Sequence, residues 1–263
     1  MVGNKVPVLI RVYKFCWKSL EKFSNLLNAC IIGFWLGILD HEDLHWIDQQ
    51  YYNDERMYHD EHYNRRGLFS WEREVIDTYF TSCKSILLIG AGGGREVLAL
   101  TQLGYEVDGY ECNSKLVEVA SNILIGEGLS ISVDWIPPDQ CPKGDKIYDG
   151  LIIGWGTYMS VQGRQRRVSL LRQLRSRTCA GSPILLSFYY RQSDTRRIKL
   201  IQLIGSSLRI LHKSEAVERG DDLVPEFVHF FTEGEIASEL YAGGFELACY
   251  STRSYGHAVG IAV

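Results

Sequence analysis

The sequence predicts an α/β fold: a seven-stranded, mostly parallel sheet wrapped by helices, with an antiparallel C-terminal hairpin and a helical N-terminal cap. Three observations predict it. From about residue 81 onward, short apolar runs alternate with helical segments, as in parallel sheets whose connections are helices. The last two runs are joined by "RSYG" alone, which is too short for a crossover helix, so they should pair antiparallel. Residues 6–80 are helical in pattern and rich in aromatics.

Composition restricts the class of protein. The chain has 263 residues, 46% of them hydrophobic, which is enough for one large core or a core and a small cap. Its formal charge of −4 argues against a surface built to neutralise nucleic acid. The seven cysteines occur singly with no CxxC pair, so we expect neither a zinc ribbon nor a disulfide framework. We therefore expect a cytoplasmic protein.

The N-terminal region, residues 1–80, is predicted to be a cap or lid, and residues 81–263 to be the core. Residues 1–23 mix charged and apolar residues and do not have the pattern of a secretion signal. The apolar stretch at 26–39 is shorter than the roughly 18 to 20 residues that span a bilayer. We expect a buried or interface helix there and no membrane span, with shallow membrane contact as the alternative.

The elements of the core follow one another in a regular order. Strands are expected in seven runs: "SILLIG", "YEVDGY", "SISVDWI", "YDGLIIG", "PILLSFYY", "FELACYST" and "HAVGIAV". Asn113 or Ser114 can cap the helix that follows the second strand. "TEGE" at 232–235 is a capping box, in which the Thr232 hydroxyl and the Glu235 carboxylate satisfy backbone amides of the next helix.

A glycine-rich turn follows the first strand, in "SILLIGAGGGREVLAL" at 85–100. Glycine permits positive φ and lets a ligand approach the backbone, and the helix after it offers unpaired amides, so the turn suits a nucleotide. The dinucleotide pattern G-x-G-x-x-G/A fails, because Arg95 stands where a small residue must pack. Gly90, Gly92 and Gly94 form G-x-G-x-G instead. Glu111, at the end of the next strand, can accept both hydroxyls of a ribose.

This pattern, with Glu111, resembles the first motif of class I S-adenosylmethionine-dependent methyltransferases, and the resemblance extends over about residues 50–263. Among them it is closest to bacterial methyltransferases of natural-product pathways. The resemblance implies a Rossmann-like core and S-adenosylmethionine as cofactor, with Asp139 near the adenine amino group and Ile136 or Pro138 lining the ring. The turn departs from the family pattern by the extra Gly93 and by Arg95, which we expect to place a cation near the cofactor carboxylate. The cofactor residues that it implies are Gly90, Ala91, Gly92, Gly94, Glu111, Cys112, Asp139, Gly154 and Trp155.

The resemblance also implies methyl transfer to a small molecule or a modified peptide natural product. In-line transfer depends on alignment and exclusion of water, which suits the aromatic segment 51–71 as a lid. "GWGT" replaces the "NPPY" signature of adenine and glutamine methylation, which argues against DNA. A carboxylate is already ionised and needs only positioning, so methyl ester formation is the expected reaction. We expect Tyr158 and His229 to be catalytic, and Tyr58, Trp71 and Tyr158 to contact substrate.

Three alternative interpretations concern other features of the chain. "HEDLH" at 41–45 matches a zinc-peptidase pattern, but the match is short, so we interpret it as a helix surface and expect no metal. Residues Arg164 to Lys199 hold ten lysines or arginines against one acid; we interpret them mainly as the water-facing side of an outer helix, and an RNA methyltransferase stays open as the alternative. A non-catalytic nucleotide-binding module stays open too, as do a homodimer and a fusion to another domain.

Overall fold

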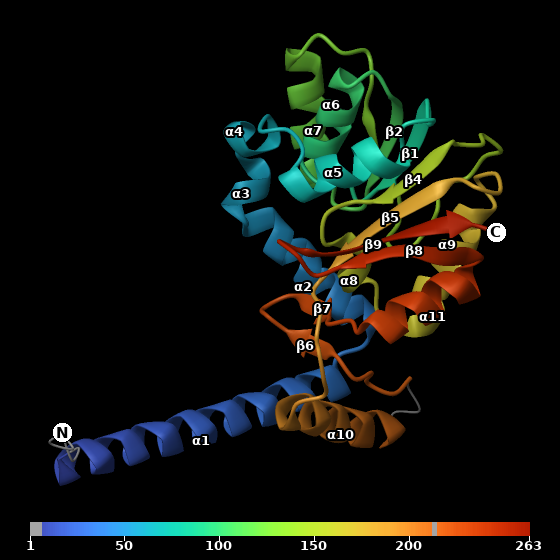
Figure 1. Cartoon of the computed structure of the whole chain (residues 1–263). Coiled ribbons are helices and arrows are strands. Elements are labelled where there is room, and N and C mark those ends of the chain that lie inside the picture. Colours follow the sequence, from blue (N-terminus) through green and yellow to red (C-terminus); the bar gives the residue numbers. More distant parts are fainter. Residues whose placement is uncertain (1–6, 212–214) are drawn as a thin grey trace, which may run out of the picture. The chain divides into compact units, whose positions relative to one another are not determined.

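The computed structural model describes residues 7–211 and 215–263 and divides into two compact units (Figure 1). The larger unit comprises His41–Ser193 and Val224–Val263. Its helices are α2 (His41–Asp54), α3 (Arg56–His59), α4 (Glu61–Asn64), α5 (Ser70–Tyr79), α6 (Arg95–Gln102), α7 (Ser114–Gly126), α8 (Thr157–Ser160), α9 (Arg164–Arg175) and α11 (Glu233–Gly243). Its strands are β1 (Ser85–Ile89), β2 (Glu106–Glu111), β3 (Val133–Trp135), β4 (Gly150–Ile153), β5 (Pro183–Phe188), β7 (Phe227–His229), β8 (Phe245–Ser251) and β9 (Gly256–Ala262).

Seven of these strands form one sheet in the order β3-β2-β1-β4-β5-β9-β8. Strands β1 to β5 run parallel to one another, whereas β9 is antiparallel to both β5 and β8. The predicted fold is therefore confirmed, including the antiparallel hairpin. The order reverses beside β1, because β2 lies on one side of it and β4 on the other. Ligands of open parallel sheets bind at such a reversal, beyond the carboxyl ends of the strands.

Alternate residues of the central strands face two separate cores. Ile86 and Leu88 of β1 pack with the helices α5, α6 and α7, whereas Leu87 and Ile89 pack with α8, α9 and α11. The period of two in side-chain direction produces this division, and it explains why the strands are continuous apolar runs in the sequence. The helices on the two faces cover the sheet completely enough that all four of these side chains are at most 8% exposed.

Helix ends in the larger unit follow the local signals. The Asn113 side chain accepts hydrogen bonds from the backbone amides of Lys115 and Leu116 at the start of α7. At α11, Thr232 Oγ1 accepts from the Glu235 amide at 3.3 Å and Glu235 Oε2 accepts from the Thr232 amide at 2.7 Å. The predicted capping box is confirmed, because this motif involves only neighbouring residues.

The smaller unit consists of the residues up to Asp40 together with Asp194–Leu223, and contains α1 (Val8–Ile38), α10 (Arg196–Leu211) and β6 (Asp221–Leu223). Two glycines allow α1 and α10 to pack closely. A Cβ on Gly33 would lie 2.9 Å from the Ile201 carbonyl oxygen, and one on Gly37 would lie 2.7 Å from Leu208 Cβ. Arg209 donates to the Leu36 carbonyl at 2.8 Å and so satisfies an orphan acceptor at the end of α1.

This division differs from a cap at 1–80 and a core at 81–263. Helices α2 to α5 belong to the larger unit, and the partner of α1 is α10, which lies more than 150 residues later in the chain. The short strands β6 and β7 also lack a sequence signal. No single helix in the described part of the chain has both the length and the apolar composition of a membrane span. Helices α1 and α2 meet these two criteria only when they are taken together, and the chain bends sharply between them.

Candidate active site

The turn after β1 adopts the conformation that its glycines permit. Gly90, Gly92 and Gly94 have φ values of +76°, +52° and +90°, which residues with a Cβ rarely adopt. A Cβ on Gly90 would lie 2.0 Å from Thr157 Oγ1, and one on Gly94 would lie 3.0 Å from Ala120 Cβ. A Cβ on Gly92 would have only Tyr58 within 4 Å, at 3.9 Å. The space beside Gly92 is therefore open.

Glu111 joins the end of β2 to this turn. Its Oε2 accepts a hydrogen bond from the Gly92 amide at 2.8 Å, and its Oε1 accepts from the Asn113 amide at 2.9 Å. Burial raises the pKa of Glu111, and these amide bonds oppose that rise. Each carboxylate oxygen has a second lone pair, so Glu111 can hold the turn and still accept from a ligand.

A cavity opens at this point, beyond the carboxyl ends of β1 and β2. Its empty space is about 860 Å³, including the part open to solvent. It is lined by His45, Asp48, Gln49, Tyr52, Tyr58, Ile89, Gly90, Gly92, Tyr110, Glu111, Cys112, Asn113, Leu116, Ile136, Pro137, Pro138, Asp139, Gln140, Trp155, Thr157, Ser160, Val161 and Leu170. The lining combines an apolar wall with a few acids and amides.

Seven of the predicted site residues line this cavity: Tyr58, Gly90, Gly92, Glu111, Cys112, Asp139 and Trp155. Three other predicted cofactor residues, Ala91, Gly94 and Gly154, do not line the cavity. Gly154 allows β4 to approach the turn, because a Cβ there would lie 2.2 Å from the Gly90 carbonyl oxygen. Ala91 is 3% exposed and donates its amide to Tyr110 at 3.0 Å. These three residues therefore contribute to the conformation and packing of the turn and not to the cavity lining.

Asp139 lies at the far side of the cavity with a positive φ of 58°. Its Oδ2 is 3.5 Å from His41 Nε2, and the other ring nitrogen of His41 lies 3.0 Å from Gln162 Oε1. Burial raises the pKa of Asp139, and His41 opposes that rise. The side-chain partners of His41, the first histidine of the "HEDLH" pattern, are thus Asp139 and Gln162, and neither belongs to that pattern.

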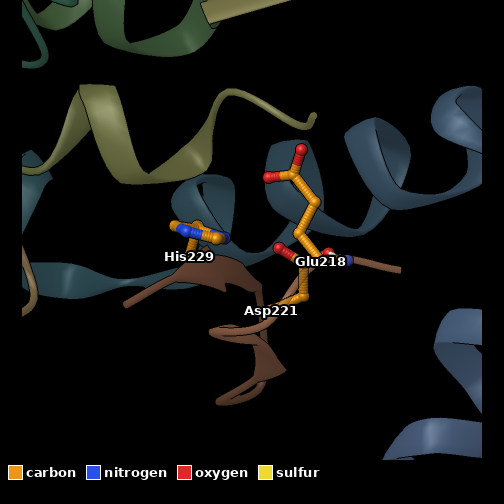
Figure 2. Close-up of side chains that lie close together, drawn as sticks. All are labelled: Glu218, Asp221 and His229. Atoms are coloured by element: carbon orange, nitrogen blue, oxygen red, sulfur yellow. Dashed lines mark hydrogen bonds between the residues drawn. The ribbon is translucent and has the colours of Figure 1, made fainter. Parts of the chain in front are cut away.

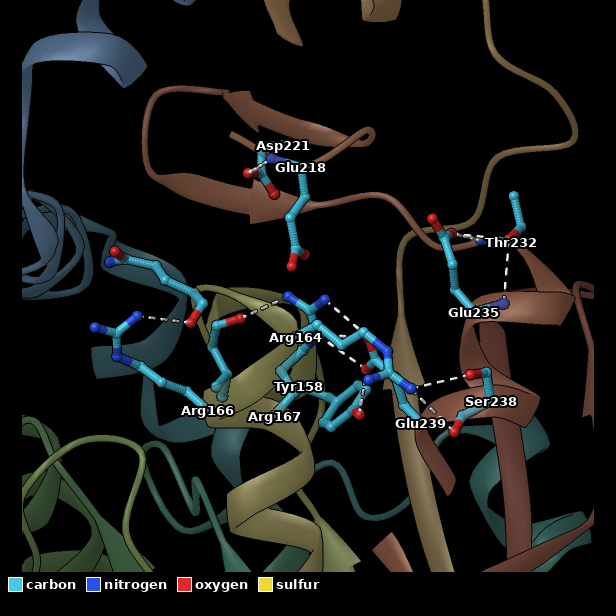
Figure 3. A network of polar contacts seen from close by, with 12 residues as sticks. Tyr158, Arg164, Arg166, Arg167, Glu218, Asp221, Thr232, Glu235, Ser238 and Glu239 are labelled. Atoms are coloured by element: carbon cyan, nitrogen blue, oxygen red, sulfur yellow. Dashed lines mark hydrogen bonds and ion pairs between the residues drawn. The ribbon is translucent and has the colours of Figure 1, made fainter. Parts of the chain in front are cut away.

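Tyr158 is not at the cavity, which corrects the expectation that it is catalytic and contacts substrate. It is fully buried on α8, and its hydroxyl donates to Glu239 Oε2 at 2.6 Å. Arg167 donates to both oxygens of the same carboxylate, at 2.8 and 2.9 Å (Figure 3). Tyr158 therefore belongs to a buried polar network between α8, α9 and α11, because the short α8 turns its ring inward against Phe231.

His229 and Trp71 also lie outside the cavity lining. His229 is on β7 (Figure 2) and is 1% exposed. Its ring centroid lies 4.5 Å from that of Phe231. Trp71 stacks on His257 at 4.8 Å and lines a different hollow, together with Cys249. Strand β7 places the His229 ring against Phe231, and helix α5 places Trp71 against His257, so neither residue has the predicted position.

Arg95 does not approach the cavity, although the chain places it directly after the glycine turn. Its guanidinium group donates to both oxygens of Glu72, each at 2.7 Å, and to the Gly67 carbonyl at 3.1 Å. Its side chain is 4% exposed and lies over the Phe69 ring. The expected contact with a cofactor carboxylate is wrong, because both terminal nitrogens of the guanidinium group donate to Glu72 on α5.

Sequence reasoning missed one group of cavity residues, which come from α2. They are His45, Asp48, Gln49 and Tyr52. Their spacing of i, i+3, i+4 and i+7 marks a single helix face, and that spacing was the available signal. Burial raises the pKa of Asp48 well above its usual range, against the hydrogen bond from the Phe227 amide at 2.9 Å. Burial lowers the pKa of His45.

The basic segment is largely used within the protein. Arg177 donates to the carbonyls of Lys146 and Pro142, and Arg175 donates to the carbonyl of Val263. Val168, Leu171 and Leu174 of α9 are buried, as an outer helix requires. The buried apolar face fits the predicted outer helix, but Arg167 on the same helix is 1% exposed and does not face water.

Solved structures share this architecture. A methyltransferase from Methanosarcina mazei, described as S-adenosylmethionine-dependent, matches 75% of this chain and 99% of its own, with 21% identity and a TM-score of 0.57. An amino pentose methyltransferase of calicheamicin biosynthesis from Micromonospora echinaspora, with S-adenosylmethionine bound, matches 76% and 94% of the two chains at 13% identity and a TM-score of 0.54. A methyltransferase from Streptomyces caelestis matches 73% and 88% at 15% identity and 0.56. The chain has the fold of the class I S-adenosylmethionine-dependent methyltransferases.

The methyltransferase fold accounts for the position of the cavity. It opens where the strand order reverses, between the turn after β1 and the end of β2. No protein-family model matches the sequence, and no curated protein matches it. The resemblance seen in the sequence is confirmed at the level of the methyltransferase fold, on which the site residues determine any chemistry.

Proposed function

We propose that the protein is an S-adenosylmethionine-dependent methyltransferase that acts on a small molecule. The observation that carries the proposal is the joining of Gly92 and Glu111 at the mouth of the cavity. The turn leaves room for a ligand beside Gly92, and the carboxylate at the end of β2 is placed to accept ribose hydroxyls. The fold neighbours support this assignment, since those described above are methyltransferases.

The residues present fit this cofactor. Glu111 would hold the ribose, Ile136 and Pro138 would line the adenine, and Asp139 would accept from its amino group. When bound, S-adenosylmethionine supplies an activated methyl group on a cationic sulfur. Tyr58 and Trp155, with ring centroids 6.4 Å apart, form an aromatic wall of the cavity that can stabilise such a cation. Helix α2 excludes water on the opposite side and orients the acceptor.

The acceptor group is proposed as either a carboxylate or an amine. A carboxylate of a small molecule or modified peptide is already ionised and needs only positioning, so methyl ester formation requires no base. A specific observation favours an amine as the second candidate: Asp48 lines the cavity and is 6% exposed. Asp48 can accept the proton that a cationic amine must lose before its nitrogen lone pair attacks the methyl carbon, whereas an ionised Asp48 would repel a carboxylate acceptor. One fold neighbour is an amino pentose methyltransferase, which supports the amine.

Calorimetry and labelled transfer test the proposal. We expect S-adenosylmethionine to bind and NADH not to bind, and we expect a methyl-labelled cofactor to label small molecules in extracts of the source organism. Treatment with base then separates the acceptors, since a methyl ester releases methanol and an N-methyl group does not. Binding of NADH in place of S-adenosylmethionine would overturn the proposal. Labelling confined to RNA would support an RNA methyltransferase, and binding without any transfer would support a non-catalytic module.

A further inference from the structure

We propose that α1 of the smaller unit lies on the surface of a membrane that contains anionic lipids. The proposal goes beyond the methyltransferase function and does not depend on it. It concerns peripheral contact along one helix, and its evidence is the distribution of apolar and charged side chains on α1.

The N-terminal two thirds of α1 are amphipathic. Arg11, Lys14, Lys18 and Lys22 follow one another at spacings of three, four and four residues, so they lie along one face. Glu21 is the one acid between residues 8 and 27. The rest of the circumference carries mainly apolar side chains, interrupted by Ser19 and Ser24: Val8, Leu9, Ile10, Val12, Tyr13, Phe15, Cys16, Trp17, Leu20, Phe23, Leu26 and Leu27.

This apolar surface is exposed in the structure. Every residue from 8 to 28 is exposed, and the first buried residue of α1 is Ala29. Leu9 is 82% exposed, Phe15 72% and Phe23 63%. Twenty residues of helix extend about 30 Å. A soluble monomer rarely exposes a continuous apolar surface of that size, so this surface requires a partner.

Helix α10 does not supply that partner. It packs against Ala29, Ile32, Gly33, Leu36 and Gly37, which at 100° per residue continue the face of the four cations. The opposite, apolar face stays exposed to the end of the helix, where Phe34, Trp35 and Ile38 are 44 to 46% exposed. One apolar face thus runs along the whole of α1, unused by the packing within the unit.

The composition of α1 favours a lipid surface over a second copy of the chain. The apolar face covers more than half of the helix circumference, whereas a helix pair buries a narrower stripe. Helices that lie in the membrane interface combine a wide apolar face rich in Trp, Phe and Leu with Lys and Arg on the polar side. The four cations against one acid complement anionic head groups, and long basic side chains can reach those groups from the polar face.

Vesicle sedimentation of the full chain tests the proposal. We expect binding to vesicles of phosphatidylcholine with 30% phosphatidylglycerol, weaker binding to phosphatidylcholine alone, and release as salt is raised. Replacing Lys14, Lys18 and Lys22 together by Gln should weaken binding to the anionic vesicles about a hundredfold. The triple variant Phe15→Ser, Trp17→Ser, Phe23→Ser should lose binding to both kinds of vesicle.

A matched control replaces three exposed apolar residues of the larger unit, with Leu103→Ser, Ile125→Ser and Tyr241→Ser, and should bind vesicles as the wild type does. Failure of the wild-type protein to bind anionic vesicles, or binding insensitive to salt and to head-group charge, would overturn the proposal. A dimer of the chain would also overturn the proposal if three results were found together. Sedimentation velocity without lipid would show the dimer, the triple variant of Phe15, Trp17 and Phe23 would be monomeric, and the dimer would not bind vesicles. The lipid and salt dependence of the wild type decides the question even where a variant fails to fold.

Discussion

At the residue scale, the candidate site depends on how one carboxylate is shared. Glu111 accepts from the Gly92 and Asn113 amides and faces the cavity. Its hydrogen bonds place the turn and the end of β2 in a fixed relation before any ligand arrives. Binding of a ligand at Glu111 therefore does not have to order the turn, so the entropic cost of binding is smaller than it would be with a mobile turn.

Replacement of Glu111 measures its contribution to cofactor binding. Glu111→Ala should weaken the binding of S-adenosylmethionine by about 1 to 3 kcal/mol, because an acceptor for the ribose and the bond to the turn are both lost. Calorimetry measures the affinity. Glu106→Gln, at the exposed start of the same strand, is the matched control and should leave it unchanged. Unaltered affinity in Glu111→Ala would remove Glu111 from the cofactor site.

Replacement of Tyr158 distinguishes a structural residue from a catalytic one. Tyr158→Phe should lower the free energy of unfolding by about 1.5 to 3 kcal/mol, because the buried Glu239 carboxylate loses a charge-assisted hydrogen bond. Methyl transfer per folded molecule should be unchanged. Urea unfolding and initial rates measure the two effects. A large loss of kcat at unchanged stability would return Tyr158 to the catalytic residues.

At the element scale, α2 contributes one face to the cavity. His45, Asp48, Gln49 and Tyr52 point into it, whereas Leu44 is buried away from it at 1% exposure. In the proposed function, α2 forms the acceptor side of the cavity, and the ends of β1 and β2 form the cofactor side.

Asp48→Asn tests the amine acceptor. The amide keeps an oxygen for the Phe227 N–H but cannot ionise, so kcat/KM for an amine should fall about tenfold to a hundredfold while the affinity for S-adenosylmethionine stays the same. Glu42→Gln, exposed on the same helix, is the control. Equal or higher kcat/KM in Asp48→Asn would favour the carboxylate acceptor, since the mutation removes a repelling acid.

At the scale of the whole molecule, buried acids link stability to pH. Glu96 is 7% exposed, accepts from the Trp155 amide at 3.3 Å and lies 3.7 Å from the Arg95 guanidinium group. Burial raises the pKa of Glu96 from 4.5 to about 7, against the attraction of Arg95. The folded state therefore favours the protonated form, and this stabilisation is present below pH 4.5 and lost as pH rises through about 7.

Glu96→Gln isolates this contribution. The free energy of unfolding of the wild type should fall between pH 5 and pH 8 by more than that of Glu96→Gln, with a difference of at most about 3 kcal/mol. Urea unfolding at the two pH values measures it. Glu246→Gln, at an exposed position on β8, should keep the wild-type dependence. Identical slopes in wild type and Glu96→Gln would show that Glu96 is ionised throughout.

The strands, the hairpin and the glycine turn were predictable because each is encoded by neighbouring residues. Gly90, Gly92 and Gly94 have positive φ values, a backbone conformation that favours glycine at each position. Glu111 ends β2, the strand that pairs with β1. The positions of Tyr158 and His229 were not predictable in this way. Each follows or forms a short element whose direction depends on packing, and both rings turn toward Phe231.

The sequence alone determined the α/β order of the elements, the antiparallel end of the sheet and the glycine turn after β1, because strand period, capping and glycine conformation act over a few residues. Only the tertiary structure decided that α2 lines the cavity, that Arg95 bonds to Glu72 and does not line the cavity, and that α1 packs against α10. Those outcomes depend on contacts between distant segments, and packing selects them from several arrangements that local propensity permits equally.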